Sequence, residues 1–383
     1  MPDVFDEVHR RCRSGEPVAL ATVVATWRSA PQPPGATMLV AADGTVTGSV
    51  SGGCVEADVY ERARRVLETG TPELTRYGIS DDDAYAVGLT CGGILDVFVE
   101  RVDARDLPEL DAVDAARRAG QPAAVVTCVA ADAAESPGAV STDPARRLGR
   151  RLVLAGQRVI GSLGDDRLDD AASADALGLL AAGRSGVLRY GYQGQRRGGG
   201  LSLFVAAYTT PPRMIVFGAI DFAGAVARLG AFLGYRVTIC DARPVFTTAR
   251  RFPEADEVVV QWPHRYLRAE VDADRVDGRT VVCVLTHDPK FDVPLLELAL
   301  RHPLAYVGAM GSRRTHDERH KLLREAGLSE AQLARLASPI GLDLGGRTPE
   351  ETAVSVAAQI VAARWGGTGR PLGALDGPIH QPG

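Results

Sequence analysis

An internal repeat is the feature that most constrains the fold of this chain. Residues 39–78 align without a gap to residues 152–191, and twelve of the forty positions are identical. Both copies contain the pattern Val-x-Gly-Ser, at 46–49 and 159–162, and the triplet Arg-Tyr-Gly, at 76–78 and 189–191. A chance match is the alternative. The repeat predicts two half-domains, near residues 18–102 and 122–208, each built as strand, turn, helix and strand. Together they would form one α/β domain over residues 1–208, with a pseudo-twofold axis.

The remaining residues, 209–383, alternate between short apolar strands and amphipathic helices. Apolar, β-branched strands between such helices indicate a parallel sheet covered on both faces, as in a Rossmann-like domain. The predicted strands are Met214–Phe217, Arg236–Cys240, Val258–Gln261, Val281–Thr286 and Ala305–Val307. The predicted helices are Phe222–Leu233, Val293–Arg301, Arg314–Ala326 and Pro349–Trp365.

Charge and cysteine content narrow the classes of function. The net charge of -5 on 383 residues argues against a large nucleic-acid footprint, which needs a clustered basic face. No stretch approaches the ~18 apolar residues of a membrane span, and the charged N-terminus lacks the apolar core of a signal peptide. The six cysteines are scattered without a disulfide or zinc spacing, which favours a reducing, cytoplasmic setting.

A glycine-cysteine loop distinguishes the first copy from the second. The first copy reads Gly-Ser-Val-Ser-Gly-Gly-Cys-Val-Glu over residues 48–56, and the second reads Gly-Ser-Leu-Gly-Asp-Asp-Arg-Leu-Asp over residues 161–169. Cys54 lies just before the helix predicted over Val55–Thr69, where a thiol is favoured as thiolate. Gly52 and Gly53 let backbone N–H groups approach a ligand closely. This combination suits an anionic ligand with a soft metal centre.

A second glycine-cysteine segment precedes the strand predicted over Ile94–Glu100. In the second copy, the segment that corresponds to Cys91, Gly92 and Gly93 is a glycine-rich run without cysteine. If the two copies share a scaffold, residues special to the first copy are candidates for chemistry. The alternative is that each cysteine is a small buried residue in a tight turn.

The C-terminal region begins with a degraded dinucleotide-binding fingerprint. Gly218 follows the first strand and Asp221 opens the next helix, while Asp241 ends the second strand, where a ribose-binding acid belongs. Ile220 stands at the second glycine position, where its β-branched side chain would obstruct a pyrophosphate. The pattern therefore predicts the fold and puts ordinary NAD(P) binding in doubt.

Three further residues follow predicted strands at the edge where open parallel sheets bind ligands. His287 follows the fourth strand, where it orients a ligand, acts as an acid or base, or caps the next helix. Gly311 and Ser312 open another helix, where they either receive an anion or serve as a plain cap.

Several of these segments resemble the XdhC/CoxI family. The matching N-terminal segments are Leu20–Val24, Ser29–Pro31, Pro34-Gly35, Gly48–Glu56 and Thr90–Gly93, and the C-terminal ones are Gly308–Arg314, Pro339–Gly345 and Thr348–Glu351. Thr90 departs from the family pattern, which has glycine before the second cysteine. The resemblance covers most of the chain.

The resemblance implies a protein that binds molybdenum cofactor, protects it and delivers it to a xanthine dehydrogenase or carbon monoxide dehydrogenase type enzyme, in concert with a cofactor sulfurase. It further implies that Cys54 contacts the metal, and that Cys91 contacts the cofactor. The resemblance and the pseudo-symmetry together favour a homodimer.

Three classes of function compete on this sequence. A cofactor-handling accessory protein accounts for the cysteine loops, the degraded fingerprint and the lack of an acid–base constellation, so we expect no catalytic residues. An NAD(P)-dependent oxidoreductase accounts for the Rossmann pattern and Asp241 but leaves Ile220 unexplained. A pure interaction scaffold leaves the Gly-Gly-Cys loop without a cause.

Overall fold

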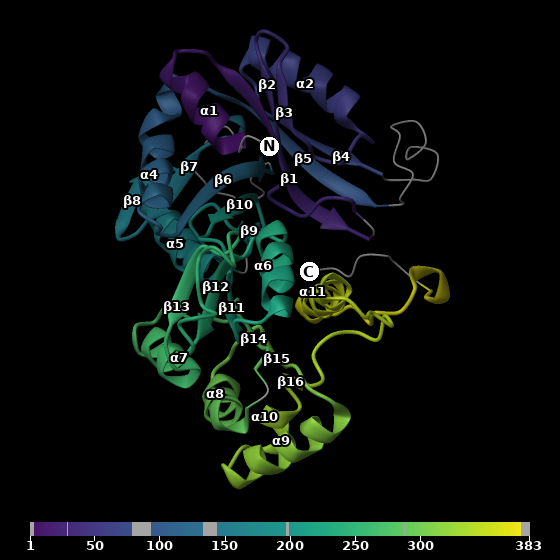
Figure 1. The fold of residues 1–383 in the computed structure, drawn as a ribbon. Helices are drawn as coiled ribbons and strands as arrows, with labels where there is room; N and C mark the ends of the chain where they lie inside the picture. The colour runs from purple at the N-terminus through teal and green to yellow at the C-terminus, as the bar shows by residue number, and fades with distance from the viewer. Residues whose placement is uncertain are drawn as a thin grey trace. The chain divides into compact units, whose positions relative to one another are not determined.

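The computed structural model describes residues 4–28, 30–78, 93–132, 144–196, 199–286 and 288–376 (Figure 1). The chain divides into two compact units, one extending to Thr210 and the other comprising Pro211–Asp376. Each unit has its own sheets and its own hydrophobic core, and each is described separately below.

The first unit contains two five-stranded antiparallel sheets with the same strand order. One sheet runs β3-β2-β1-β5-β4 and the other runs β8-β7-β6-β10-β9. The strands of the first sheet are β1 (Val18–Trp27), β2 (Thr37–Ala41), β3 (Val46–Gly48), β4 (Glu73–Tyr77) and β5 (Ile94–Val102). Those of the second are β6 (Ala123–Ala131), β7 (Arg151–Ala155), β8 (Arg158–Gly161), β9 (Gly186–Tyr190) and β10 (Leu201–Tyr208). The predicted pair of pseudo-repeats is confirmed by this matching topology.

The helices of the first unit follow the same repeat. Helix α1 (Val4–Arg13) precedes β1 as α4 (Leu107–Arg118) precedes β6, and the short helices η1 (Ala104–Asp106) and η2 (Pro144–Arg147) lie between strands. Helix α2 (Glu56–Thr69) lies between β3 and β4, as α5 (Asp166–Ala181) lies between β8 and β9. The sequence pattern did not predict α1 or α4, so the repeating unit is one helix longer than expected.

Each sheet buries one face under a helix and turns the other face inward. Alternate β1 residues Ala19, Ala21 and Val23 pack under α2, and Ala124, Val126 and Cys128 of β6 pack under α5. The inner faces meet through a small cluster of four buried side chains, Val24, Phe98, Val129 and Phe204. Because side chains alternate between the two faces of a strand, each sheet has one core under its helix, and a further core lies between the two sheets.

The gapless sequence alignment of the two copies is wrong by one residue at β2. Thr22 pairs with Thr37 in the first sheet, whereas the corresponding Thr127 pairs with Arg151. The hairpin after β2 has one residue more than the hairpin after β7, so Leu39 is equivalent to Val153 and not to Leu152. Side chains alternate between faces along a strand, and this shift decides which residues point inward.

Beyond that hairpin, the identical residues of the two copies have structural roles. Gly48 and Gly161 both adopt positive φ, and an added Cβ would lie 2.3 Å from the carbonyl oxygen of Thr37 or 2.5 Å from that of Arg151. The Tyr77 hydroxyl donates to Asp58 of α2 at 2.7 Å, and the equivalent Tyr190 donates to Asp175 of α5 at 2.6 Å, one helical turn beyond the position of Asp58. The residues that are identical in the two copies therefore maintain the shared backbone fold.

The second unit is built on a six-stranded parallel sheet. The strand order is β13-β12-β11-β14-β15-β16, which places the reversal of direction between β11 and β14. Its strands are β11 (Arg213–Phe217), β12 (Arg236–Asp241), β13 (Glu257–Val260), β14 (Val281–Val284), β15 (Tyr306–Ala309) and β16 (Leu336–Ala337). The predicted parallel, Rossmann-like sheet is confirmed, and β16 is a strand that the sequence pattern did not predict.

Helices cover both faces of this sheet. Helices α6 (Asp221–Phe232) and α11 (Pro349–Trp365) lie side by side on one face (Figure 1), where Val226 and Val356 share a core. The opposite face packs against α7 (Pro263–Asp272), α8 (Pro289–Arg301), α9 (Arg313–Glu325) and α10 (Glu330–Leu333). The short helix η3 (Leu372–Ala374) follows α11. Helix α7 lay outside the predictions.

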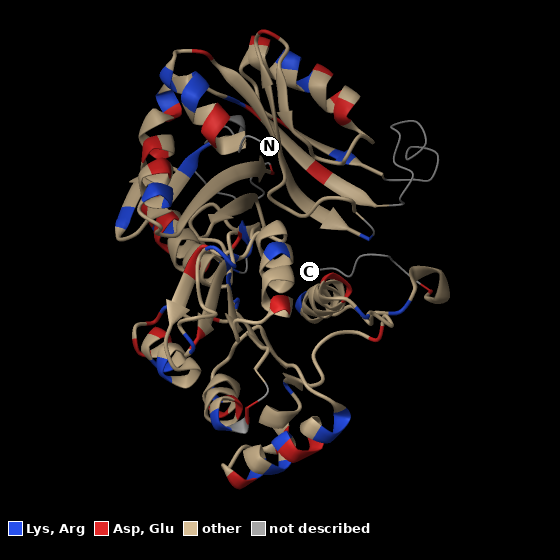
Figure 2. Ribbon diagram, viewed as in Figure 1, with Lys and Arg blue, Asp and Glu red and all other residues tan. Residues whose placement is uncertain are grey.

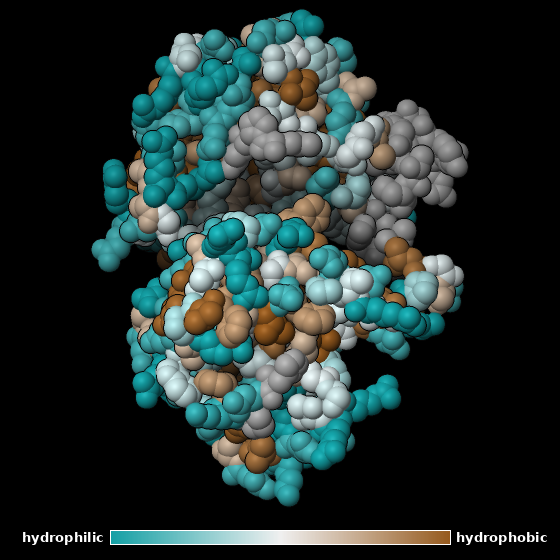
Figure 3. Space-filling model, viewed as in Figure 1, coloured by the Kyte–Doolittle hydropathy of each residue, from teal (hydrophilic) through white to brown (hydrophobic). Residues whose placement is uncertain are grey.

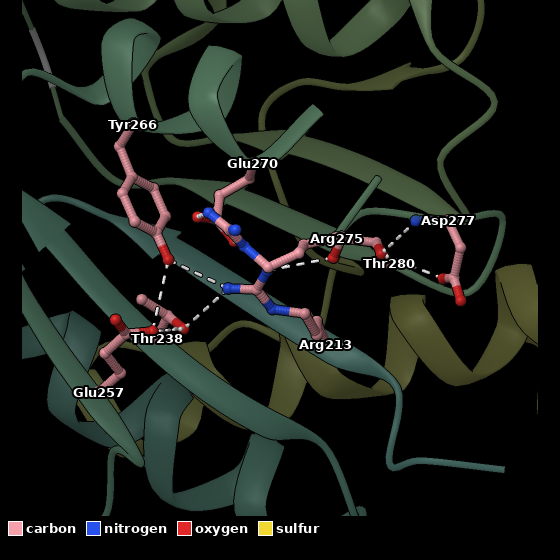
Figure 4. Close-up of polar contacts among 8 residues, drawn as sticks. All are labelled: Arg213, Thr238, Glu257, Tyr266, Glu270, Arg275, Asp277 and Thr280. Atoms are coloured by element: carbon pink, nitrogen blue, oxygen red, sulfur yellow. Dashed lines mark hydrogen bonds and ion pairs between the residues drawn. The ribbon is translucent and has the colours of Figure 1, made fainter. Parts of the chain in front are cut away.

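A polar network joins α7 to the amino ends of the strands in the second unit (Figure 4). Arg213 of β11 pairs with Glu270 of α7, and Arg275 lies 2.5 Å from the same carboxylate. Tyr266 accepts a hydrogen bond from Arg213 at 3.0 Å. Glu270 is 5% exposed, so its charge depends on these two guanidinium partners.

The described surface is mixed in character. Acidic residues lie in the first turn of α1 and of α4 and arginines in the last turn, while α9 carries both signs along its length (Figure 2). Several of these residues form ion pairs within one helix, such as Arg314–Glu318 at 2.9 Å. The face in Figure 3 intermingles hydrophobic and hydrophilic side chains. No helix among the described residues is long and apolar enough to cross a bilayer.

Candidate functional site

The Gly-Gly-Cys loop connects β3 to α2 in the first unit. Gly52 and Gly53 have φ values of 78° and 118°, which residues with a side chain rarely adopt. A Cβ at either position would meet no atom within 4 Å, and both glycines are exposed. The loop therefore presents open backbone that a ligand can approach.

A carboxylate, Glu56, lies at the centre of this loop. It accepts hydrogen bonds from the hydroxyls of Ser49 and Ser51 and from five backbone N–H groups, which belong to Val50, Ser51, Gly52, Gly53 and Val55. The Gly52 and Gly53 bonds measure 3.0 and 2.9 Å. Burial alone would raise the pKa of Glu56, but these hydrogen bonds outweigh it and lower the pKa to about 2. The amides predicted to receive a ligand's anion therefore bind the protein's own carboxylate.

Comparison with the corresponding loop of the second copy separates the features that both copies share from those that only the first copy has. Asp169 occupies the position of Glu56 and accepts from the Ser162 hydroxyl at 2.7 Å and from Leu163 N–H at 2.8 Å. Helix α5 begins three residues earlier than α2 when the copies are aligned. Gly53, Cys54 and Val55 thus form a non-helical turn where the second copy has the first turn of a helix, with Gly53 exposed, Cys54 partly exposed and Val55 buried. The serine–acid contact is shared, and the unwound turn with its cysteine is specific to the first copy.

Cys54 is the half-exposed member of this turn. Its N–H donates to the Ser51 hydroxyl at 2.9 Å, which fixes the backbone, and its side chain rests against the edge of the core under α2. Helix α2 begins at Glu56, one residue later than predicted. Gly93 is buried at the start of β5, whereas Cys91 and Gly92 lie outside the described residues.

The other described cysteines are packing residues. Cys12, Cys128, Cys240 and Cys283 are free and buried, and burial raises the pKa of each thiol, to about 11 for Cys12 and Cys128 and about 12 for Cys240 and Cys283. Cys128, Cys240 and Cys283 lie in strands, as the sequence predicts. Among the described cysteines, only Cys54 combines partial exposure with a loop setting.

In the second unit, the turn after β11 is shaped by close packing. An added Cβ on Gly218, whose φ is 116°, would lie 3.1 Å from the backbone of Leu285 and Thr286. Ile220 precedes α6 without capping it through its side chain, and it lines a cavity at the carboxyl ends of the strands. Asp221 is largely exposed and pairs with Arg251 at 3.1 Å.

Asp241 is buried beside the same turn. It accepts from Ala219 N–H at 2.7 Å, from Arg243 N–H at 2.9 Å, and from the Arg243 guanidinium at 2.7 and 3.0 Å. Burial opposes ionisation, but these hydrogen bonds lower the pKa of Asp241 overall. Asp241, Arg243 and Ile220 all line a cavity of about 350 Å³, together with Ala242, Pro263, Leu285, Thr286, Asp288 and Phe291. Sequence reasoning missed Arg243, which lies two residues beyond the predicted acid.

Three predicted residues of the second unit remain to be placed. His287 lies outside the described residues. Ser312 caps α9 by accepting from Thr315 N–H at 3.1 Å, and neither Ser312 nor Gly311 lines the cavity. A buried ion pair that sequence reasoning missed, Arg319–Asp292 at 3.1 Å, lies nearby. Arg319 also donates to the Met310 carbonyl and Asp292 accepts from Thr286, so this pair ties strand ends together.

Within the described ranges, no group of three or more His, Cys, Asp or Glu side chains is placed to hold a metal ion. A metal held at Cys54 would therefore have to bring most of its own ligands.

Two family models match the chain. The model described as the XdhC and CoxI family matches residues 11–78 and 116–191, one segment in each half of the first unit. The model described as the XdhC Rossmann domain matches residues 214–360, which span most of the second unit.

Individual relatives match over nearly the full length. A Bacillus subtilis protein named as a probable xanthine dehydrogenase subunit is 28% identical over 352 residues, covering 91% of this chain and 94% of the relative. The Escherichia coli molybdenum cofactor insertion chaperone PaoD is 26% identical over 351 residues, covering 92% and 85%. A crystal structure described as a xanthine dehydrogenase from Bacillus halodurans shares the fold, with a TM-score of 0.66, 23% identity and 97% coverage of both chains.

Proposed function

The chain belongs to the XdhC and CoxI family, and from that membership we propose that it is an accessory protein that binds molybdenum cofactor and passes it to a molybdenum enzyme. Two relatives support this role through their names, the molybdenum cofactor insertion chaperone PaoD and the probable xanthine dehydrogenase subunit of Bacillus subtilis. The cofactor is cargo in this role, and the chain's contacts to it must be reversible.

The observation that carries the proposal is the half-exposed Cys54 in a turn that only the first copy has unwound. A thiolate is a ligand for a soft metal centre, and one thiolate is enough when the cofactor brings sulfur ligands of its own. Gly52 and Gly53 leave open space in front of this turn. Because Glu56 already accepts their N–H groups, we infer that the loop contacts its cargo through Cys54 and not through a phosphate held by the amides.

The finer parts of the proposal concern partners. The target enzyme is of the xanthine dehydrogenase or carbon monoxide dehydrogenase type, and a cofactor sulfurase acts with the chain. We further propose that the protein works in the cytoplasm as a homodimer and is not itself a catalyst. Cys91, Gly92, Gly93 and the strand-end residues Gly218, Asp221, Asp241, His287, Gly311 and Ser312 remain proposed cofactor contacts.

Molybdenum retention tests the role of Cys54. The protein is purified from a host that makes the cofactor, and molybdenum per chain and fluorescent pterin released on oxidation are measured. Cys54→Ser should lower both by about tenfold or more, because a neutral hydroxyl is a poor ligand for a soft metal. Cys128→Ala, which removes a buried thiol from the same unit, is the matched control and should retain the native content. Equal losses in both variants would overturn the assignment.

A second candidate function rests on the cavity at the strand ends of the second unit. It lies where doubly wound sheets bind nucleotides, and Asp241 and Arg243 line it. An NAD(P)-dependent oxidoreductase would use this place. Ile220 argues against that function, because it stands where the backbone must approach a pyrophosphate.

A further inference from the structure

A second cavity lies between the two sheets of the first unit, away from the Gly-Gly-Cys loop. Its volume is about 280 Å³, near the low end of pockets that hold small molecules. Both halves of the repeat line it, and helices α1 and α4 pack together beside it (Figure 1). Nothing in the function proposed so far uses this cavity.

Buried charges concentrate at this cavity. Arg151 of β7 lies 2.7 Å from Glu100 of β5 and 2.5 Å from Asp106, so the ion pair joins the two halves. Glu100 is 6% exposed, and burial raises its pKa. Glu109 of α4 also lines the cavity, and its Oε2 atom is buried without a hydrogen-bond partner among the described residues. Three carboxyl groups therefore lie near one guanidinium, and the described part of the chain leaves one of their acceptor atoms without a donor.

The scaffold does not require these charges. Glu100 pairs with Leu20 across the first sheet, and the equivalent residue of the second sheet is Ala206, which pairs with Val125. Arg151 is likewise equivalent to Thr37. The two halves thus share a backbone but differ where their side chains enter this cavity. Buried ion pairs are weak stabilisers relative to apolar packing, so a structural role alone gives a poor account of the cluster.

The remaining lining identifies a class of ligand. Phe5, Phe204 and Tyr208 supply aromatic walls for a flat ring, and the hydroxyls of Thr22, Thr37, Thr127 and Ser185 supply further hydrogen-bonding groups. A carboxylate with a free oxygen pairs with neighbouring N–H donors, and a guanidinium pairs with a carbonyl oxygen. A 2-amino-4-oxopyrimidine ring presents neighbouring N–H donors and a carbonyl oxygen along one edge.

We propose that this cavity binds a 2-amino-4-oxopyrimidine ring, the ring that pterins and guanine share, with Glu109 accepting its N–H groups. Assigning the ring to the pterin of molybdenum cofactor rests on the proposed function, whereas the ring chemistry rests on the cavity alone. Glu109 is a binding residue in this scheme, and Arg151 faces the ring's carbonyl oxygen.

Titration of cofactor-free, full-length protein tests the proposal. Free pterin and GMP are the two probes, AMP is the control ligand, and binding is followed by pterin fluorescence and by calorimetry. We expect pterin to bind and AMP not to bind. Glu109→Gln should weaken pterin binding by about tenfold or more, because a hydrogen bond to a charged acceptor is lost. The melting temperature of this variant should not fall, since Glu109 Oε2 has no hydrogen-bond partner to lose among the residues that the structure describes.

Two further variants make the outcome decisive. Glu61→Gln removes an exposed carboxylate from α2 and should bind pterin like the native protein. Ala206→Leu fills the cavity and should abolish binding while the protein stays folded, as judged by circular dichroism. Binding of GMP without pterin would assign the site to a guanine nucleotide and overturn its pterin assignment. Absence of both, or native affinity in Glu109→Gln, would overturn the cavity proposal. Cys54-dependent molybdenum retention would then still stand as a separate result.

Discussion

At the level of single residues, Glu56 sets the shape of the turn that carries Cys54. Seven hydrogen-bond donors converge on its carboxylate, five of them backbone N–H groups that an α-helix or a bound anion would otherwise engage. The longer side chain of glutamate reaches further into the loop than Asp169 does in the second copy. The extra reach satisfies the amides that the two glycines expose.

Replacing Glu56 by glutamine should therefore destabilise the first unit. Glutamine keeps one acceptor oxygen and turns an N–H group toward backbone N–H groups, so several bonds are lost or become repulsive. The expected loss is about 1–3 kcal/mol in the free energy of unfolding. Urea titration of Glu56→Gln measures it, with Glu61→Gln on the same helix as control. Equal stability of the two variants would contradict the role given to Glu56.

The same residue predicts a dependence on pH. The pKa of Glu56 is about 2 in the folded protein, below the usual 4.5, so its stabilisation is complete above pH 4.5 and is lost as the pH falls toward 2. The stability gap between the native protein and Glu56→Gln should shrink as the pH is lowered from 5 to 3. Urea titrations at intervals of pH measure the gap, and a constant gap would refute the assignment.

Residue by residue, comparison of the two copies found part of this site. It isolated Gly52, Gly53 and Cys54 because those residues have no counterpart in the second copy. It missed Glu56, because an acid stands at the same position in both copies and looked like scaffold. The signal was present in the serine–acid pairs Ser49–Glu56 and Ser162–Asp169, which recur at equal spacing.

At the level of elements, strands and helices with a clear apolar periodicity could be predicted, whereas very short strands and a one-residue insertion could not. The five predicted strands of the parallel sheet agree with the structure to within a few residues, because long apolar runs between helices leave little choice. Strand β16 has two residues and carries no periodicity to detect. The extra residue in the hairpin after β2 was also invisible, because a gapless alignment keeps the apolar character of both strands while exchanging their faces.

The turn between β11 and α6 yields a prediction about nucleotides. Ile220 lines the cavity at the strand ends, so NAD and NADP should bind weakly or not at all to the native protein. Ile220→Gly should improve binding, since Gly218 and Asp241 already fit the fingerprint. Ile220→Val keeps a β-branched side chain and is the matched control. Calorimetric titration of the three proteins decides the matter, and equal affinities would show that Ile220 is not the obstacle.

At the level of the whole molecule, the cores of the two units are separate. Every hydrophobic cluster of the first unit draws on residues up to Tyr208, and both clusters of the second unit draw on residues from Met214 onward. The proline pair at 211–212 lies between these two sets of clusters. Two units with separate cores should retain separate stabilities.

Calorimetry of selected variants tests that separation. Glu270→Gln leaves the guanidinium groups of Arg213 and Arg275 short of a buried partner, which should cost the second unit about 3–5 kcal/mol. Leu168→Ala, which empties a fully buried position on α5, should cost the first unit about 2–5 kcal/mol. If the units unfold independently, each substitution lowers one thermal transition and leaves the other in place. A single transition that both substitutions lower together would show that the two cores unfold as one cooperative structure.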